Sequence, residues 1–512
     1  MSRIVQVANF VTPSSSGLRT TLGHLATGYA QAGHEVIQVL PGPRDQDLRT
    51  PWGRQIMRRS PAVPGTGYRV LNGGSGLTRL LDRLGPDRLE AHDRTTLRGL
   101  GGWARKRGVS SLVVSHERLD RWLEQWLPRQ LPLTSLADRY NRALAEDFDV
   151  VLTTTAWAAA EFERLPTAGL VRVPLGVNLV RLHPSAADAA WRAQQLRGAE
   201  HLLVMVSRLS REKRPLLAVQ TIAELARRGH SVRLAIAGSG PQRRVLHRHA
   251  EGMPVDFLGY VSDRAQLARL LASADLLLAP GPVETFGLAA LEALACGTSA
   301  VVNAASALPE VLGDSVGACA EGHPVAFADA IERVLAVPST DRTVAARARA
   351  EEFPWTATVA GFLCAHGLGP CTASAGAPRP VEDRQGVSSD RRWGLVVAGS
   401  NRGDGMSITV VALGDSFSCG EGVGLDIAPE QTWAALLCQA LPGARLMNLS
   451  TAGARVRDVR RHQLPVALIA RPQLPPSWWG STTSSAVDCH TTRSPRICRP
   501  WYGDCMTAAR AS

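Results

Sequence analysis

The sequence predicts an α/β protein with two doubly wound, Rossmann-like domains. Short apolar runs alternate with segments of helical spacing from residue 4 to about residue 368, a pattern typical of βαβ units and parallel sheets. The alternation restarts after residues 171–184, which indicates a crossover between two domains. The length of 512 residues and the hydrophobic content of 45% are enough for two or three packed domains.

The first domain is expected over residues 1–177. A strand over residues 4–10 leads into a loop of small residues with Gly17, and helical spacing follows over residues 22–31. In open α/β sheets ligands bind at the C-terminal ends of strands. Gly17 would let the backbone approach a ligand there, although an ordinary turn would look the same. A later strand over residues 110–116 ends at His116, for which both a functional and a structural role are open.

The second domain is expected over residues 178–352, and a helix over residues 353–368 should cross back to the first domain. A strand over residues 201–207 is followed at once by Arg208 and Lys213. These two residues could be surface cations, or they could bind a diphosphate together. The compact ammonium group of Lys213 is suited to a diphosphate oxygen.

The central feature is the stretch from Glu284 to Glu292, which follows a buried strand and opens a helix near Phe286 or Gly287. The free N–H groups of a helix start form an anion site. A carboxylate on either side of that site could bind the hydroxyls of a sugar and of a ribose, with a phosphate between them.

The net charge of +12 indicates which partners the protein could bind. Much of the positive charge lies in residues 1–120, which suits an anionic membrane surface but also a merely arginine-rich composition. Aromatic and basic residues do not alternate as they do in nucleic-acid binders, so no nucleic-acid partner is expected. Residues 51–60 could be a solvated loop or a short membrane-surface segment.

The location expected from the sequence is cytoplasmic. All cysteines lie at or after Cys296 and none has CxxC spacing, which argues against a disulfide scaffold or a zinc site. No apolar run approaches the roughly 20 residues of a membrane span, and no signal-peptide pattern precedes the first strand.

The C-terminal third has a different character. Residues 369–405 read as a linker, residues 406–474 as an incomplete α/β fragment, and residues 475–512 as disordered. The stretch around Ser416 resembles the start of an SGNH/GDSL-type hydrolase. A serine nucleophile needs a base, and the later elements of that family are absent. We therefore interpret the segment after the linker as the product of a truncated or frameshifted neighbouring gene that is fused to this one.

Residues 3–368 resemble the GT-B-fold glycosyltransferases of family 4, which transfer a sugar from a nucleotide with retention. The resemblance implies that the two Rossmann-like domains face each other across a cleft. The resemblance rests on the Gly17 loop, on Arg208 with Lys213, on residues 257–263, and on the two glutamates eight positions apart. It implies the following roles: diphosphate binding by Arg208 and Lys213; sugar contact by Glu284 and His116; ribose contact by Glu292; and nucleotide-sugar contact by Gly17, Val261, Asp263, Phe286, Gly287 and Leu288. No metal is expected, because cations and amides would stabilise the diphosphate.

The sequence is also similar to that of actinobacterial mannosyltransferases that extend phosphatidylinositol mannosides. The similar stretches are residues 5–10, 17–20, 115–121 and 279–282. This implies GDP-mannose as donor, a phosphoinositide-type lipid acceptor, and a peripheral position at the inner face of the plasma membrane. The carboxylate of Asp263 could accept the two adjacent guanine donors, or it could cap a helix. One departure is Ser16-Gly17 where those enzymes have paired glycines; Asn178 also replaces their aspartate.

Three alternatives remain open. The same fold could use another nucleotide sugar and a soluble acceptor. A dinucleotide oxidoreductase would need a complete G-x-G-x-x-G after a strand, and residues 73–76 and 238–240 carry only fragments of it. The chain could also bind a nucleotide sugar without turning it over.

Overall fold

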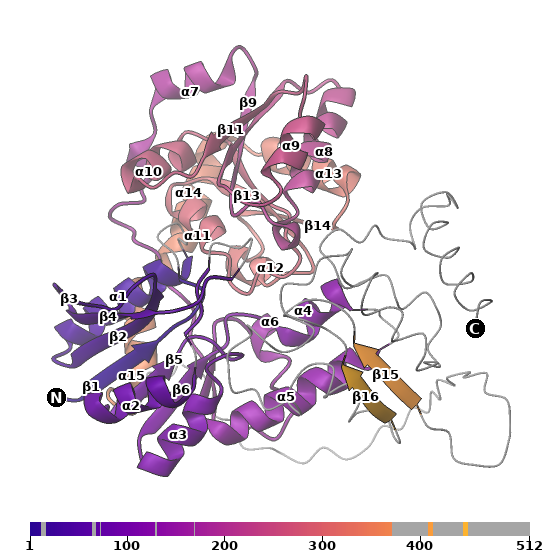
Figure 1. The fold of residues 1–512 in the computed structure, drawn as a ribbon. Helices are drawn as coiled ribbons and strands as arrows, with labels where there is room; N and C mark the ends of the chain where they lie inside the picture. Colours follow the sequence, from indigo (N-terminus) through magenta and orange to yellow (C-terminus); the bar gives the residue numbers. More distant parts are fainter. Residues whose placement is uncertain are drawn as a thin grey trace, which may run out of the picture. The chain divides into compact units, whose positions relative to one another are not determined.

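The computed structural model describes residues 1–11, 17–63, 68–71, 73–127, 131–167 and 169–370, together with the backbone of residues 408–412 and 444–448. The chain divides into two compact units, residues 1–378 and residues 379–512. The first unit contains two α/β domains, each built on its own sheet (Figure 1).

The sheet of the first domain has the order β3-β4-β2-β1-β5-β6-β7-β8. All neighbours are parallel except β3 and β4, which form an antiparallel hairpin at one edge. Its strands are β1 Arg3–Val7, β2 Glu35–Gly42, β3 Gln46–Thr50, β4 Gly53–Arg59, β5 Arg88–Ala91, β6 Ser110–Val114, β7 Val150–Thr153 and β8 Leu170–Arg172. Its helices are α1 Gly17–Gln31, α2 Ser75–Leu84, α3 Gly99–Arg107, α4 Leu119–Trp126, α5 Leu133–Asp147 and α6 Ala156–Ala159.

The sheet of the second domain is parallel throughout, in the order β11-β10-β9-β12-β13-β14. Its strands are β9 His201–Val206, β10 Val232–Ala237, β11 Val255–Gly259, β12 Leu276–Ala279, β13 Ser299–Asn303 and β14 Gly317–Ala320. The helical segments from here to residue 365 are η1 Pro184–Ala186, α7 Ala189–Leu196, η2 Arg211–Lys213, α8 Pro215–Arg227, α9 Arg243–His249, α10 Arg264–Ala272, α11 Leu288–Ala295, α12 Leu308–Leu312, α13 Pro324–Leu335, α14 Ser339–Glu351 and α15 Trp355–Ala365.

Apolar strands buried on both faces explain why both sheets are covered by helices. Strand β9 is an almost continuous apolar run, and its residues divide between two buried clusters on opposite faces of the sheet. Such a run is typical of a strand inside a parallel sheet. The two clusters place α11 on one face and α8 on the other.

Helix α15 packs against α1 of the first domain. The rings of His24 and Trp355 stack with their centroids 4.4 Å apart. A Cβ at Gly28 would lie only 2.4 Å from Val359, so glycine allows the two helices to come this close.

Two local expectations were wrong. Residues 51–60 are neither a solvated loop nor a surface helix, because Gly53–Arg59 forms strand β4, in register with β2. Gly17 is the first residue of helix α1 rather than part of the loop before it.

Two other features concern membranes and cysteines. No helix in the described part of the chain has the length and apolar character needed to cross a membrane. Cys296 and Cys319 are free thiols, whereas Cys364 is disulfide-bonded, which the cysteine spacing did not predict.

In the second unit, β15 Ile408–Ala412 and β16 Ala444–Asn448 pair in parallel. Ser416, and with it the hydrolase-like motif, lies outside the described residues, as do the linker and the segment expected to be disordered.

Candidate active site

The loop from Gly281 to Gly287 joins strand β12 to helix α11 and carries Glu284. Gly287 caps the helix with φ of 77°, and a Cβ there would lie 2.1 Å from the side chain of Leu308. Glycine is therefore required both by the backbone conformation and by the space. The helix begins at Leu288, one or two residues later than expected.

Lys213 and Glu284 form an ion pair across this loop. The Nζ atom of Lys213 donates to Oε1 of Glu284 at 2.6 Å, and the two side chains are 30% and 19% exposed. Both residues line one small pocket together with Ser207, Gly281 and Gly287. The structure thus brings together a cation, a carboxylate and a helix start, as the sequence predicted.

Glu292 lies on α11, where its side chain is 12% exposed. Burial raises the pKa of its carboxyl, and the guanidinium of Arg264 opposes this shift. Nη1 of Arg264 donates to Glu292 at 3.0 Å, and Nη2 donates to the hydroxyl of Thr20 in the first domain. Arg264 therefore links Glu292 to helix α1.

Gly17 faces the start of α11 from the other domain, since a Cβ on it would lie 3.8 Å from Cδ1 of Leu288. The ring of Phe286 is only 4% exposed and packs edge-to-face on Phe353, with centroids 6.1 Å apart. Any contact of Phe286 with a ligand would be made by its backbone.

Asp263 caps helix α10, because its Oδ1 accepts from the amide of Ala265 at 2.9 Å. The capping interpretation is confirmed, and guanine binding by this exposed carboxylate stays a prediction. Val261 lies nearby on the loop before α10 and packs partly against the core of the second domain.

Arg208 reaches the first domain through an aromatic contact. Its guanidinium carbon lies 4.6 Å from the ring centroid of Tyr68, and Tyr68 packs edge-to-face on Phe10. Phe10 has φ of 57°, unusual for a bulky residue.

His116 follows β6 and is held at its backbone and at its ring. The hydroxyl of Thr285 donates to the His116 carbonyl at 2.6 Å. Nε2 of His116 lies 3.0 Å from Nδ1 of His92. Burial, together with His92, lowers the pKa of His116 to about 3, against a smaller opposing effect of Glu90.

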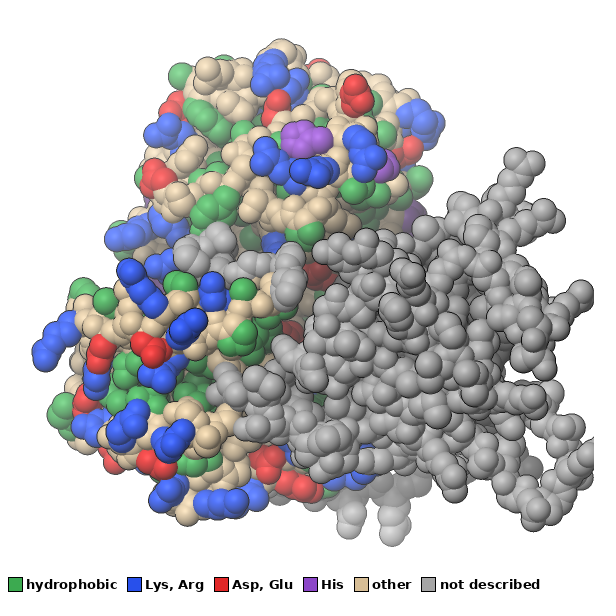
Figure 2. Space-filling view, in the orientation of Figure 1, with side chains coloured by type: hydrophobic (Ala, Val, Ile, Leu, Met, Phe, Trp, Pro, Cys, Tyr) green, Lys and Arg blue, Asp and Glu red, His purple; other side chains and the backbone are tan. Residues whose placement is uncertain are grey.

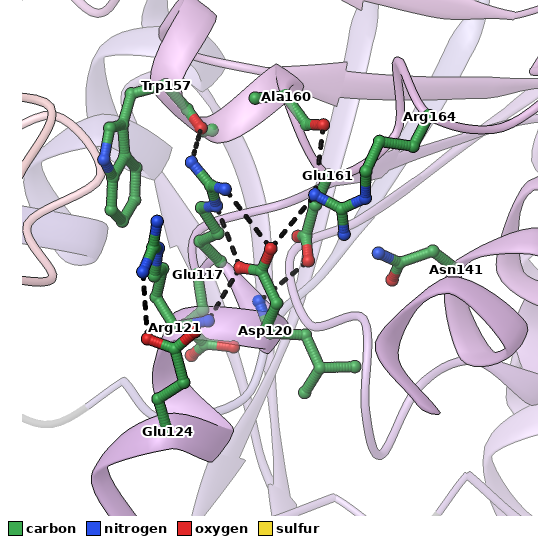
Figure 3. Close-up of polar contacts among 12 residues, drawn as sticks. Glu117, Asp120, Arg121, Glu124, Asn141, Trp157, Ala160, Glu161 and Arg164 are labelled. Carbon is green, nitrogen blue, oxygen red and sulfur yellow. Dashed lines mark hydrogen bonds and ion pairs between the residues drawn. The ribbon is translucent and has the colours of Figure 1, made fainter. Parts of the chain in front are cut away.

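The segment after His116 is fixed by a polar network between the start of α4 and the turn that follows α6 (Figure 3). Asp120 accepts from Arg118 at 2.8 Å and from Arg164 at 3.1 Å. Glu161 accepts from the amide of Leu119 at 3.0 Å. These contacts use the charged side chains of Arg118 and Asp120, two residues of the stretch 115–121.

Sequence reasoning missed several residues of this site: Thr20, Tyr68, Glu90, His92, Arg264 and Thr285. Glu90 and His92 could have been predicted as site residues, because they lie at the C-terminal end of a strand, where ligands bind in open α/β sheets. The other contacts join residues distant in sequence, and no local pattern marks them.

Comparison with known proteins identifies the chain. Residues 15–181 match the family model "Glycosyltransferase Family 4", and residues 188–351 match "Glycosyl transferases group 1". A Mycobacterium tuberculosis protein named GDP-mannose-dependent alpha-(1-6)-phosphatidylinositol dimannoside mannosyltransferase is 46% identical over 368 residues, which is 96% of that protein and 71% of this chain. The chain is a family 4 glycosyltransferase.

A second relative of this glycosyltransferase is D-inositol 3-phosphate glycosyltransferase from Mycolicibacterium smegmatis, 30% identical and covered over 73% of its length by 59% of this chain. Among solved structures, sucrose-phosphate synthase from Thermosynechococcus elongatus matches with a TM-score of 0.57 at 24% identity, over 96% of that protein and 70% of this chain. Anabaena HepE in complex with UDP and glucose matches with a TM-score of 0.55 at 16% identity, over 99% and 72%. These structures confirm the expected GT-B fold.

Proposed function

We propose that this glycosyltransferase transfers mannose from GDP-mannose to a phosphatidylinositol mannoside, with retention at the anomeric carbon. The observation that carries the proposal is the 46% identity to a mannosyltransferase of that name, which extends over nearly all of the relative. The Lys213–Glu284 pair at the start of α11 supports a nucleotide-sugar site in this chain.

The chemistry follows from the geometry of that site. As the bond between mannose and phosphate breaks, negative charge develops on the departing diphosphate. Lys213, Arg208 and the free amides at the start of α11 would stabilise this charge in a partly dry site. Glu284 would accept hydrogen bonds from hexose hydroxyls, and this role would separate it from Lys213 when the donor binds.

The proposed reaction uses no metal cofactor. Cations and amides would take the place that a divalent ion has in other sugar-nucleotide sites. The described residues contain no group of three or more His, Cys, Asp or Glu placed to hold a metal ion. Turnover that survives an excess of EDTA would support this part, and turnover restored only by added Mg²⁺ or Mn²⁺ would contradict it.

We propose that the lipid acceptor brings the protein to an anionic membrane surface, at the cytoplasmic face. Helix α9 supports such a contact, since its exposed arginines Arg243, Arg244 and Arg248 form no ion pair within the described residues. Figure 2 shows basic side chains and histidine gathered where Figure 1 places α9. Salt-sensitive co-sedimentation with vesicles containing phosphatidylinositol, and none with phosphatidylcholine alone, is the expected result.

The deciding experiment is transfer of radiolabelled mannose by the full chain. GDP-mannose and extracted phosphatidylinositol mannosides are supplied, and the lipid fraction is counted. Label should enter a more polar lipid with the native chain and not with Glu284→Ala. No lipid labelling by the native chain would contradict the proposal.

A second candidate function uses a soluble acceptor and another nucleotide sugar. The relative named for D-inositol 3-phosphate favours it. A thermal-shift series with GDP-mannose, UDP-glucose and UDP-N-acetylglucosamine separates the two. Stabilisation by a UDP-sugar alone would favour the second candidate.

A further inference from the structure

A carboxylate of the second domain binds the backbone at the start of a helix in the first domain. Glu310 lies on α12, and its Oε1 and Oε2 atoms accept hydrogen bonds from the amide of Ala156 at 2.9 and 2.8 Å. Its Oε2 also accepts from the amide of Trp157 at 3.3 Å. The indole Nε1 of Trp157 donates to the carbonyl of Ala305 at 3.0 Å. These bonds join α12 and the loop before it to helix α6.

The amides that Glu310 binds are ones that helix α6 cannot satisfy by itself. The first N–H groups of a helix have no carbonyl partner within the helix. The hydroxyl of Thr155 caps one of them, because it accepts from the amide of Ala158 at 3.1 Å. Glu310 binds two others, and a negative charge is favourable at this end of a helix. Helix α6 is therefore capped by one residue from each domain.

In the described part of the chain, the carboxylate of Glu310 bonds only to the first domain. The backbone of α12 is held separately, since Arg349 donates to the carbonyl of Glu310 at 2.8 Å and to that of Val311 at 2.9 Å. Val311 and Leu312 are buried in the core of the second domain. Removal of the carboxylate should therefore leave the second domain folded.

The same short helix also contacts the proposed nucleotide-sugar site. The amide of Ala307, directly before α12, donates to the carbonyl of Glu284 at 2.9 Å. Leu308 begins the helix and lines the pocket that also contains Glu284 and Lys213. Glu310 follows two positions later. One segment of a few residues thus carries both a wall of this pocket and the contact with the first domain.

We propose that Glu310 is a positioning residue that holds the nucleotide-sugar pocket in a fixed place relative to the first domain while the sugar is transferred. The inference rests on the proposed function, with the acceptor presented by the first domain. Transfer needs both substrates in one arrangement, and a misplacement of about 1 Å can lower a rate roughly 100-fold. The groups proposed to bind the nucleotide, Arg208, Lys213 and Glu292, all belong to the second domain. Nucleotide affinity should therefore not depend on Glu310.

Hydrogen exchange of the full chain measures the contact without any substrate. Peptides that contain the amides of Ala156 and Trp157 should exchange roughly tenfold faster in Glu310→Ala than in the native chain, the effect of losing a hydrogen bond to a charged group. Peptides from α8, on the other face of the second sheet, should exchange alike in both. Unchanged exchange at residues 156–157 would overturn the proposal. This result does not depend on the identity of the donor or the acceptor, so it is separate from a failure of the proposed function.

Kinetics test the positioning role. Glu310→Ala should lower kcat for mannose transfer to the lipid roughly tenfold, within the effect of a small misplacement of two substrates. The affinity for GDP and the hydrolysis of GDP-mannose by water should stay native, because neither needs the acceptor. Glu310→Gln still offers an oxygen to the amides and should recover much of the transfer rate.

Glu200→Ala is the matched control. Glu200 is another exposed glutamate of the second domain, but it precedes β9 and so lies at the opposite edge of the sheet from α12. It should keep the native transfer rate. Native transfer by Glu310→Ala would overturn the proposal. A loss of GDP affinity equal to the loss of transfer would also overturn it, because Glu310 would then maintain the nucleotide site itself.

Discussion

The hydroxyl of Thr285 donates a hydrogen bond of 2.6 Å to the carbonyl of His116, from one α/β domain to the other. The carbonyl of Thr285 accepts two more bonds, from the hydroxyl of Thr155 at 2.9 Å and from that of Thr154 at 3.3 Å. Thr285 directly follows Glu284, so the residue next to the proposed sugar-binding carboxylate is joined to the first domain by three hydrogen bonds. These bonds set the spacing between Glu284 and His116.

Replacing Thr285 by valine keeps its shape but removes the donor to His116. We expect kcat/KM to fall about tenfold, the equivalent of one ordinary hydrogen bond. Thr298→Val is the matched control, because its hydroxyl donates to the carbonyl of Leu271 inside the second domain. If both variants lose the same activity, the Thr285 bond has no special role in the site.

Lys213 should matter for the chemical step. Lys213→Met removes the charge next to Glu284 and should lower kcat by about 100-fold or more, because a preorganised cation on a leaving diphosphate has an effect of this size. Lys213→Arg keeps the charge and should lose less. The chain has one other lysine, Lys106 on α3, and Lys106→Met should retain native turnover. Unchanged kcat in Lys213→Met would exclude the diphosphate role.

How much of this site could be predicted depends on where each residue stands relative to a strand end. Lys213 and Glu284 follow β9 and β12, and strands that are neighbours in a parallel sheet bring their ends together. Their meeting was therefore foreseeable from the sequence. The contact of Thr285 with His116 joins residues 169 positions apart in two domains, and it depends on how the domains are placed.

The misjudged segment at Gly53–Arg59 shows a different limit. Strand β4 carries three arginines, and Ile56 is its one fully buried side chain. With one buried position, the segment shows no alternation of apolar and polar residues from which a strand could be predicted. The segment is a strand because it pairs with β2 and β3, and the local sequence does not show which strands will pair with it.

Glu292 should affect donor affinity more than turnover. Glu292→Gln keeps the size of the side chain but removes the charge that Arg264 binds. We expect the KM for GDP-mannose to rise about tenfold with kcat little changed, the pattern of an interaction equal in ground and transition states. Arg264→Met, which leaves the carboxylate in place without its cation, is the companion variant. A lower kcat with an unchanged donor KM would contradict the assignment.

The lowered pKa of His116 predicts that the folded chain loses stability in acid. Its pKa of about 3 in the folded chain lies below the ordinary value of 6.5, so between these values the unfolded chain binds one more proton than the folded chain. Stability should therefore fall as the pH drops from 6.5 towards 3, by at most about 1.4 kcal/mol per pH unit, and this group should have no effect above pH 6.5.

Urea unfolding of the full chain between pH 4 and pH 8 checks this sign. In His116→Gln, the fall in unfolding free energy on acidification should be shallower than in the native chain. His249→Gln, at an exposed position on α9, controls for the loss of a histidine as such. An unchanged slope in His116→Gln would mean that other groups near His92 and Glu90 cause the acid sensitivity.

Gly287 should be the least replaceable glycine of the site. An alanine there meets both a left-handed backbone with φ of 77° and a contact of 2.1 Å with Leu308. We expect Gly287→Ala to lower the free energy of unfolding by roughly 2–4 kcal/mol, the sum of backbone strain and overpacking.

Gly252 has nearly the same φ, 73°, with nothing within 4 Å of a Cβ. Gly252→Ala therefore isolates the backbone contribution, about 1 kcal/mol, and the difference between the two variants in urea unfolding measures the contact with Leu308. Equal losses would show that Leu308 moves aside freely, and that the start of α11 is less rigid than an anion site built from its amides requires.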